Sequence, residues 1–200
     1  LHLSNDDLVD VTTILGKHGA VYASFDSLYI ASRHSASESA SWTLSDDAEA
    51  QPEVTTIHKF RLSGGTTDYL GSGAAKGRIL NQFAMDEHNG YLRLATTTGH
   101  LPDPNTHNTL SVLDEHDGGL RVVGELDRIA PDEDIRAVRF VGETGYIVTF
   151  KKTDPLFTLD LSVPTEPRIV GELKIPGFST YIHPIDQDHL LSIGYDADDQ

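Results

Sequence analysis

The sequence predicts an all-β fold made of repeated four-stranded units. Short runs of β-branched and aromatic residues are separated by Gly, Pro, Asp and Asn, and helix periodicity is almost absent. Segments 113–126 and 159–173 resemble each other, and the VGEL motifs within them start 47 residues apart. Four short antiparallel strands at a repeat of about 40 to 50 residues are typical of β-propeller blades.

We expect three complete blades and the beginning of a fourth. The blades are expected at 20–72, 79–126, 135–174 and 179–200. The expected strands are 20–24, 28–32, 55–62 and 66–72, then 79–85, 90–95, 109–114 and 119–126, then 135–141, 145–150, 155–161 and 167–174, and finally 179–184 and 189–194. Residues 9–15 stand where the outermost strand of a preceding blade would lie.

Two insertions interrupt this pattern. Residues 32–53 are rich in Ser, Ala and acidic residues and are expected to be mobile, and residues 96–108 form a second insertion. Both join a second strand to a third, so both are expected on the same rim of the propeller.

The number of blades bears on assembly. Propellers close with four to eight blades, and closure protects their strand edges. Three blades cannot close, so the chain is expected to be part of a longer propeller or to self-associate through its open blade edges. A sequence that stops in mid-blade favours the first alternative.

Composition excludes several classes of partner. The chain has 15 Lys and Arg residues against 31 Asp and Glu, a formal net charge of -16. Such a charge repels nucleic acid and anionic lipid, and no apolar run approaches the ~20 residues that cross a membrane. With no cysteine, disulfides and thiolate metal sites are excluded.

No catalytic motif is present in the sequence. The Gly71–Gly77 segment lacks Walker spacing, and G-x-S-x-G and H-E-x-x-H do not occur. The ten histidines are scattered, without the close pairs that zinc or copper sites often use. We expect no cofactor, with calcium as the alternative, because Asp196 and Asp198 alternate as carboxylates do in a calcium loop.

One face of the propeller is the default place for a ligand. Loops from second to third strands and between blades emerge there, and loops on a rigid scaffold carry function. Hairpins such as those at 88–90 and 143–145 lie on the opposite face and are interpreted as structural. The candidate ligand-binding residues on the loop face are Asp132, Asp134, Lys151, Lys152, Asp154 and Phe178.

The innermost strands would line the central channel of the propeller. They offer Asn81, Arg139 and His183 as channel-lining candidates. No carboxylate is expected to point inward from these strands, which argues against a channel metal held by these blades alone.

Several strings resemble a known family. The segments at 55–62, 79–97, 148–186 and 189–196 are similar to the secreted beta-propeller domain proteins of bacteria and archaea, distant relatives of WD-repeat propellers. The resemblance implies a propeller outside the cytoplasm and supplies no catalytic residue.

Three functional hypotheses remain open. The first is a noncatalytic extracytoplasmic module that interacts with a protein or a polysaccharide. The alternative is a calcium-dependent hydrolase or lactonase-like enzyme that uses further blades. The third is a purely structural domain of a surface protein whose activity lies in another domain. The absence of catalytic motifs favours the first.

Overall fold

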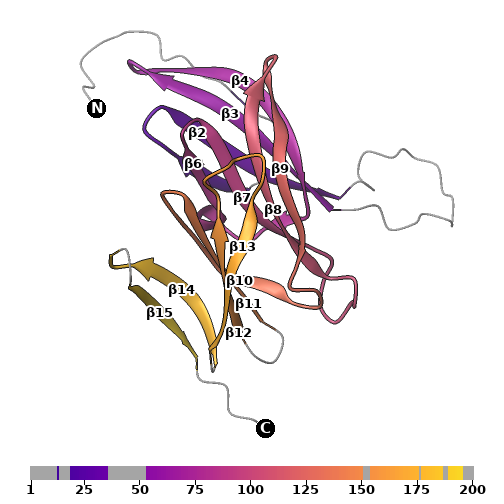
Figure 1. Cartoon of the computed structure of the whole chain (residues 1–200). Helices are drawn as coiled ribbons and strands as arrows, with labels where there is room; N and C mark the ends of the chain where they lie inside the picture. Colours follow the sequence, from indigo (N-terminus) through magenta and orange to yellow (C-terminus); the bar gives the residue numbers. More distant parts are fainter. Residues whose placement is uncertain are drawn as a thin grey trace, which may run out of the picture.

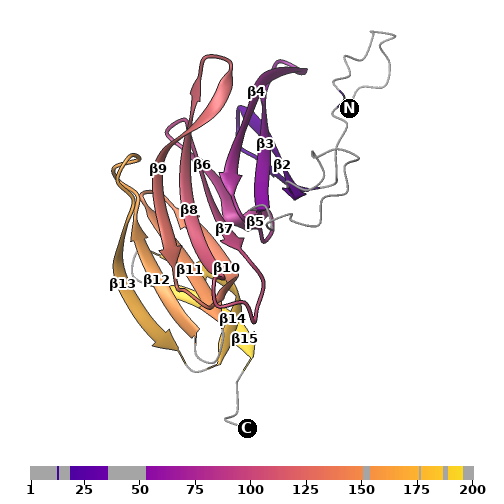
Figure 2. The same cartoon turned by 90° about the vertical axis from the view of Figure 1, so that its right-hand side faces the viewer.

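The chain folds into four antiparallel sheets that follow one another in chain order (Figures 1 and 2). The computed structural model describes residue 13 and residues 19–35, 53–150, 154–175, 177–186 and 189–195. Of the expected strand 9–15 only residue 13 is described, and most of the insertion 32–53 lies outside these ranges. At the edges of that insertion, residues 32–35 and Glu53 belong to strands.

The first sheet has the strand order β1-β2-β3-β4. Its strands are β1 (Ala20–Ala23), β2 (Ser27–Ser35), β3 (Glu53–Ser63) and β4 (Thr66–Lys76). In β3, Thr55, Ile57 and Lys59 are buried and alternate with partly exposed residues, as expected when one face of a strand packs against a neighbouring sheet.

The second sheet differs from expectation at its innermost strand. Its strands are β5 (Arg78–Ile79), β6 (Met85–His88), β7 (Tyr91–Thr98), β8 (His107–His116) and β9 (Gly119–Ile129). A continuous strand was expected at 79–85, but the 3₁₀ turn η2 (Gln82–Ala84) separates β5 from β6. The turn forms because the Asn81 side chain accepts a hydrogen bond from the Phe83 backbone N–H at 2.9 Å.

The third sheet is complete and the fourth has two described strands. The third consists of β10 (Asp134–Val141), β11 (Thr144–Phe150), β12 (Asp154–Asp160) and β13 (Arg168–Ile175), and the fourth of β14 (Phe178–Pro184) and β15 (Leu190–Tyr195). The all-β prediction of four-stranded antiparallel propeller blades is therefore confirmed.

Tight hairpins join neighbouring strands. At Asn89-Gly90 both residues have positive φ angles, 52° and 83°, as the turn between β6 and β7 requires. Asp117-Gly118 repeats this geometry between β8 and β9, with φ angles of 48° and 75°. The short polar side chains and the glycines of these pairs tolerate the left-handed conformation.

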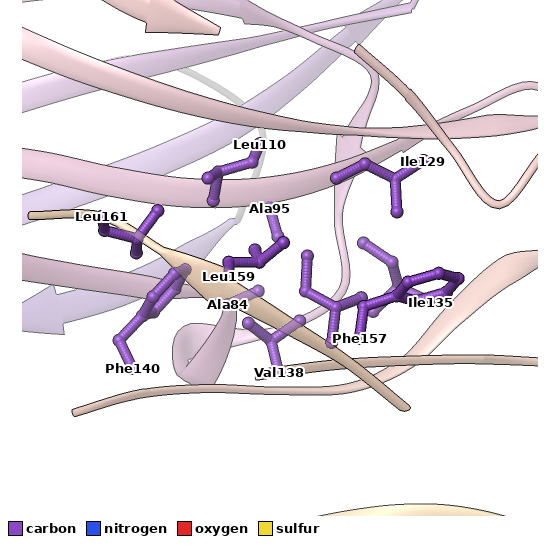
Figure 3. Close-up of a cluster of buried hydrophobic side chains, with 11 residues drawn as sticks. Ala84, Ala95, Leu110, Ile129, Ile135, Val138, Phe140, Phe157, Leu159 and Leu161 are labelled. Carbon is purple, nitrogen blue, oxygen red and sulfur yellow. The ribbon is translucent and has the colours of Figure 1, made fainter. Parts of the chain in front are cut away.

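Apolar side chains fill the spaces between successive sheets. The second and third sheets enclose a cluster of buried residues, shown in Figure 3, in which Leu110 and Ala95 face Val138, Phe157 and Leu159. A second cluster, which includes Tyr29 and Leu92, lies between the first and second sheets. Burial between sheets explains why both faces of β7 are buried along most of its length.

The outermost strands of the first two sheets approach closely at glycines. A Cβ atom added to Gly73 of β4 would lie 2.4 Å from the Leu120 carbonyl oxygen of β9. One added to Gly71 would lie 2.0 Å from the Gly118 carbonyl oxygen. Only glycine allows the backbones to come this close.

The described sheets form an open arc, with β1–β4 at one end and β14–β15 at the other (Figures 1 and 2). Apolar residues are exposed on strands of the last two sheets: Val170 and Leu173 of β13 are 58% and 59% exposed, and Ile193 of β15 is 56% exposed. Ring closure is not seen among the described residues, and self-association through open edges stays a prediction.

Candidate binding cavity at the inner strands

The 3₁₀ turn η2 presents Phe83 at the inner side of the sheets. The turn contacts β1 and β10, the innermost strands of the neighbouring sheets. The Phe83 ring is 41% exposed, although Ala84, the next residue, is fully buried. An ordered turn thus holds an exposed aromatic ring where three sheets meet.

Arg139 of β10 lies against two aromatic rings. Its guanidinium carbon is 5.2 Å from the centroid of the Phe83 ring and 6.0 Å from that of Tyr181 in β14. The two rings also meet edge to face, with centroids 6.2 Å apart. These are cation–π and aromatic contacts between three different sheets.

Arg139 and Phe83 border a cavity of about 310 Å³. The lining also includes Val21, Tyr22, Ala23, Gln82, Met85, Asp86 and Phe140. The wall therefore combines apolar side chains with an amide, a phenol, a carboxylate and a guanidinium, a mixture typical of small-ligand sites.

The Asp86 carboxylate in the cavity wall is compensated by a neighbouring cation. The Arg93 guanidinium donates a hydrogen bond to it and a second, of 2.6 Å, to the Gly142 carbonyl oxygen. Arg93 is 3% exposed and also stacks over the Phe140 ring at 5.2 Å. The carboxylate of Asp86 keeps lone pairs that can accept hydrogen bonds from hydroxyl groups.

A second polar cluster joins the first two sheets near their hairpins. The Glu87 carboxylate accepts hydrogen bonds from the hydroxyls of Tyr29 at 2.9 Å and Ser27 at 3.2 Å. The Lys59 ammonium lies 3.8 Å from Glu87 and 3.1 Å from Glu115. Burial raises the pKa of the Tyr29 phenol well above its ordinary value, and the neighbouring Glu87 charge adds to that effect.

The Tyr29, Lys59 and Glu87 cluster was not identified from the sequence. Tyr29 is fully buried and Lys59 is 6% exposed, so the cluster holds sheets together and offers little access to a ligand. One signal was available: Lys59 alternates with Ile57 and Thr55 on the buried side of its strand, and a lysine in that position requires a partner.

The comparisons with known proteins agree with this architecture. The model of a family described as "Beta propeller domain" matches residues 1–200. The chain belongs to this family. The expected resemblance to propeller domain proteins is therefore confirmed.

Two archaeal relatives of this beta-propeller chain are much longer than the chain itself. It is 51% identical over 142 residues to an uncharacterised protein of Archaeoglobus fulgidus, a match that covers 71% of this chain and 21% of that protein. It is 50% identical over 148 residues to the uncharacterised protein MJ1554 of Methanocaldococcus jannaschii, covering 73% of this chain and 23% of that protein. The chain thus spans less than a quarter of the length of these relatives.

The three channel-lining candidates lie in three different surroundings in the structure. Arg139 lines the cavity. His183 is exposed beside Tyr181, to whose ring it is stacked with centroids 6.3 Å apart. Asn81 is exposed and caps the turn that carries Phe83, so it positions a cavity residue.

The loop-face candidates do not form a described cluster. Asp132 has a φ of 69° in the turn before β10, where its backbone N–H donates to the Thr106 carbonyl at 2.7 Å. Asp134 pairs with Arg136 at 3.1 Å. Asp154 and Phe178 begin β12 and β14, and Lys151 and Lys152 lie outside the described residues.

A carboxylate on the loop face was also not identified from the sequence. Glu53, at the start of β3, pairs with Arg33 of the same sheet and with Arg78 at 3.3 Å. The His100 Nε2 atom lies 3.3 Å from the same carboxylate, in the loop before β8. Glu53 thus connects the first and second blades at this rim, where two arginines pair with its carboxylate.

The calcium alternative rests on residues outside the described part of the chain. Asp196 and Asp198 both lie there. Within the described residues, no group of three or more His, Asp or Glu side chains is arranged to hold a metal ion. Within the same residues, no helix has the length and apolar character needed to cross a membrane.

Proposed function

We propose that this chain is a noncatalytic binding module that takes its ligand, a polysaccharide or a protein, at the inner cavity. The observation that carries the proposal is the half-exposed Phe83 ring beside Arg139 and Tyr181 at the edge of a cavity of about 310 Å³. Exposed apolar surface marks interaction sites, and aromatic and arginine side chains are enriched among the residues that carry binding energy.

The scaffold supports a binding role for this cavity. Phe83, Arg139 and Tyr181 come from three successive blades, and each is fixed by a capped turn or by strand pairing. Side chains held on rigid elements lose little conformational entropy when a ligand binds.

We further propose that the module works outside the cytoplasm. The resemblance to secreted propeller domain proteins supports this location, and the acidic composition supports solubility at a cell surface. Labelling of intact producing cells with a membrane-impermeant amine reagent tests it, because exposed lysines such as Lys76 are labelled in intact cells only if the domain faces outward.

The binding proposal is tested on arrays of immobilised polysaccharides and peptides. We expect the full chain to bind at least one member of the array and the Phe83→Ala variant to lose about tenfold or more of that affinity. Tyr69→Ala is the matched control, because Tyr69 is also exposed, at 48%, but does not line the cavity. Equal losses in both variants, or none in Phe83→Ala, contradict the proposal.

A further inference from the structure

We infer that the inner cavity binds a hexuronate, a sugar ring that carries one carboxylate, with Arg139 as the carboxylate-binding residue. This inference rests on the proposed binding function and names its ligand class. It follows from the unmatched charge of Arg139, from the rings beside it and from the polar groups of the cavity wall.

Arg139 differs from the other partly or fully buried cations of the described chain. These cations are Lys59, Arg78, Arg93, Arg136 and Arg139. The first four each have a carboxylate within 4.0 Å. Among the described residues Arg139 has no ion pair and no hydrogen-bond acceptor, only its two rings.

A partly desolvated guanidinium without an anion is costly unless a ligand supplies the anion. The guanidinium carbon of Arg139 lies over the Phe83 and Tyr181 rings, and these contacts occupy none of its N–H groups with a hydrogen-bond acceptor. Two N–H groups of a guanidinium can bind both oxygens of one carboxylate. Because the chain carries about twice as many acidic as basic residues, the lack of a carboxylate within ion-pair distance of Arg139 among the described residues points to a site for an external anion.

The charge of the site favours a monoanion. Arg139 is uncompensated, whereas Arg93 already neutralises Asp86 in the same wall. A phosphate group carries close to two negative charges near neutral pH and would face the Asp86 carboxylate with one free cation. A carboxylate matches the single charge of Arg139.

The remaining features of the cavity suit a sugar ring. Its volume of about 310 Å³ lies at the small end of ligand sites and can hold one ring. The C–H face of a pyranose can pack against the exposed Phe83 ring. The Gln82 amide and the Asp86 carboxylate are placed to meet hydroxyl groups, and the Tyr22 hydroxyl, which accepts from the Glu87 backbone N–H at 3.0 Å, still has a proton to donate.

Calorimetry or ligand-observed NMR with the full chain tests the inference. The probes are sodium glucuronate, glucose as the neutral analogue, and N-acetylglutamate as an acidic peptide analogue. We expect glucuronate to bind at least about tenfold more tightly than either of the others, because only it combines a carboxylate with a hydroxylated ring.

Two arginine variants of β10 provide the matched pair. Arg139→Gln should reduce glucuronate affinity about tenfold or more, whereas Arg136→Gln should leave it unchanged, because Arg136 pairs with Asp134 and stacks on Phe150. Arg139→Lys, which keeps the charge but not the two-pronged geometry, should give an intermediate loss. Circular dichroism checks that each variant is folded.

The outcomes separate the inference from the proposed function. Equal affinity for glucuronate and glucose, both lost in Phe83→Ala, overturns the hexuronate assignment and leaves the binding module intact. Stronger binding of N-acetylglutamate overturns it in favour of an acidic peptide. Equal losses in Arg139→Gln and Arg136→Gln overturn the role of Arg139.

Discussion

Arg93 and Arg139 occupy opposite kinds of site in the same propeller. Each guanidinium stacks over a phenylalanine ring at 5.2 Å. Arg93 is 3% exposed and donates hydrogen bonds to Asp86 and to the Gly142 carbonyl, so it joins the second and third blades. Arg139 is partly exposed, and within the described residues its guanidinium lies over two aromatic rings and has no carboxylate partner.

The contrast between Arg93 and Arg139 shows how a cation that stabilises the fold can be told apart from one that is available to a ligand. Ring contact alone does not distinguish them, since each guanidinium lies over a phenylalanine ring. The presence of a carboxylate partner within the fold does, because a cation that stabilises the fold must recover its lost hydration there.

The largest effect is expected from removing the charge of Arg93. Arg93→Met leaves the Asp86 carboxylate and the Gly142 carbonyl without their donor and should lower the free energy of unfolding by about 3 kcal/mol. Urea denaturation measures the change. The double variant Asp86→Asn with Arg93→Met should lose less than the single variant, and a larger loss would show that the ion pair is not the cause.

A smaller effect is expected at Tyr29, with a characteristic pH dependence. Tyr29→Phe removes the hydrogen bond to Glu87 and should cost about 2 kcal/mol at pH 8. Because the folded-state pKa of Tyr29 lies above its unfolded value of 10.0, its contribution is complete below pH 10 and is lost as the pH rises further.

Urea midpoints measured from pH 8 to pH 11 test this dependence. The wild-type protein should lose up to about 1.4 kcal/mol per pH unit above pH 10 relative to Tyr29→Phe. Parallel pH curves for the two proteins would show that Tyr29 does not titrate differently on unfolding.

Asn81 links fold stability to ligand binding, because it caps the turn that positions Phe83 and does not itself line the cavity. Asn81→Ala removes the acceptor for the Phe83 N–H and should lower stability by about 1 kcal/mol. It should also weaken binding at the cavity. Asn81→Asp, which keeps a side-chain acceptor, should restore both properties, and failure to do so would separate Phe83 placement from the cap.

The smallest effect on stability is expected at Arg139. Arg139→Gln loses only cation–π contacts and should change the free energy of unfolding by about 0.5 kcal/mol. A loss as large as that of Arg93→Met, in the same urea experiment, would make Arg139 a structural residue and remove the distinction drawn above.

The strands and hairpins could be predicted from sequence because local chemistry determines them. Asn89-Gly90 and Asp117-Gly118 fix their turns, and the repeated VGEL segments fix the period of the blades. The break at η2 could not be predicted, because it depends on a side-chain cap within an apolar run that also suits a strand.

The cavity was only partly predictable from the sequence. Arg139 was a channel-lining candidate because it belongs to an expected innermost strand. Its contacts with Phe83 and Tyr181 were not expected, because they join three blades that are distant in sequence. The carboxylate of Asp86 in the cavity wall was also missed, because the expected innermost strand ended one residue before it.

The glycines of β4 have a mechanical consequence. At Gly71 and Gly73 the first blade rests on the backbone of β9 and of the turn before it, at a separation where even one methyl group would collide. Backbone atoms cannot be compressed or change rotamer, so this contact acts as a hard stop against rotation of one blade towards the next. The wedge angle between the first two blades, and with it the curvature of the propeller, is therefore set by the main chain at this rim.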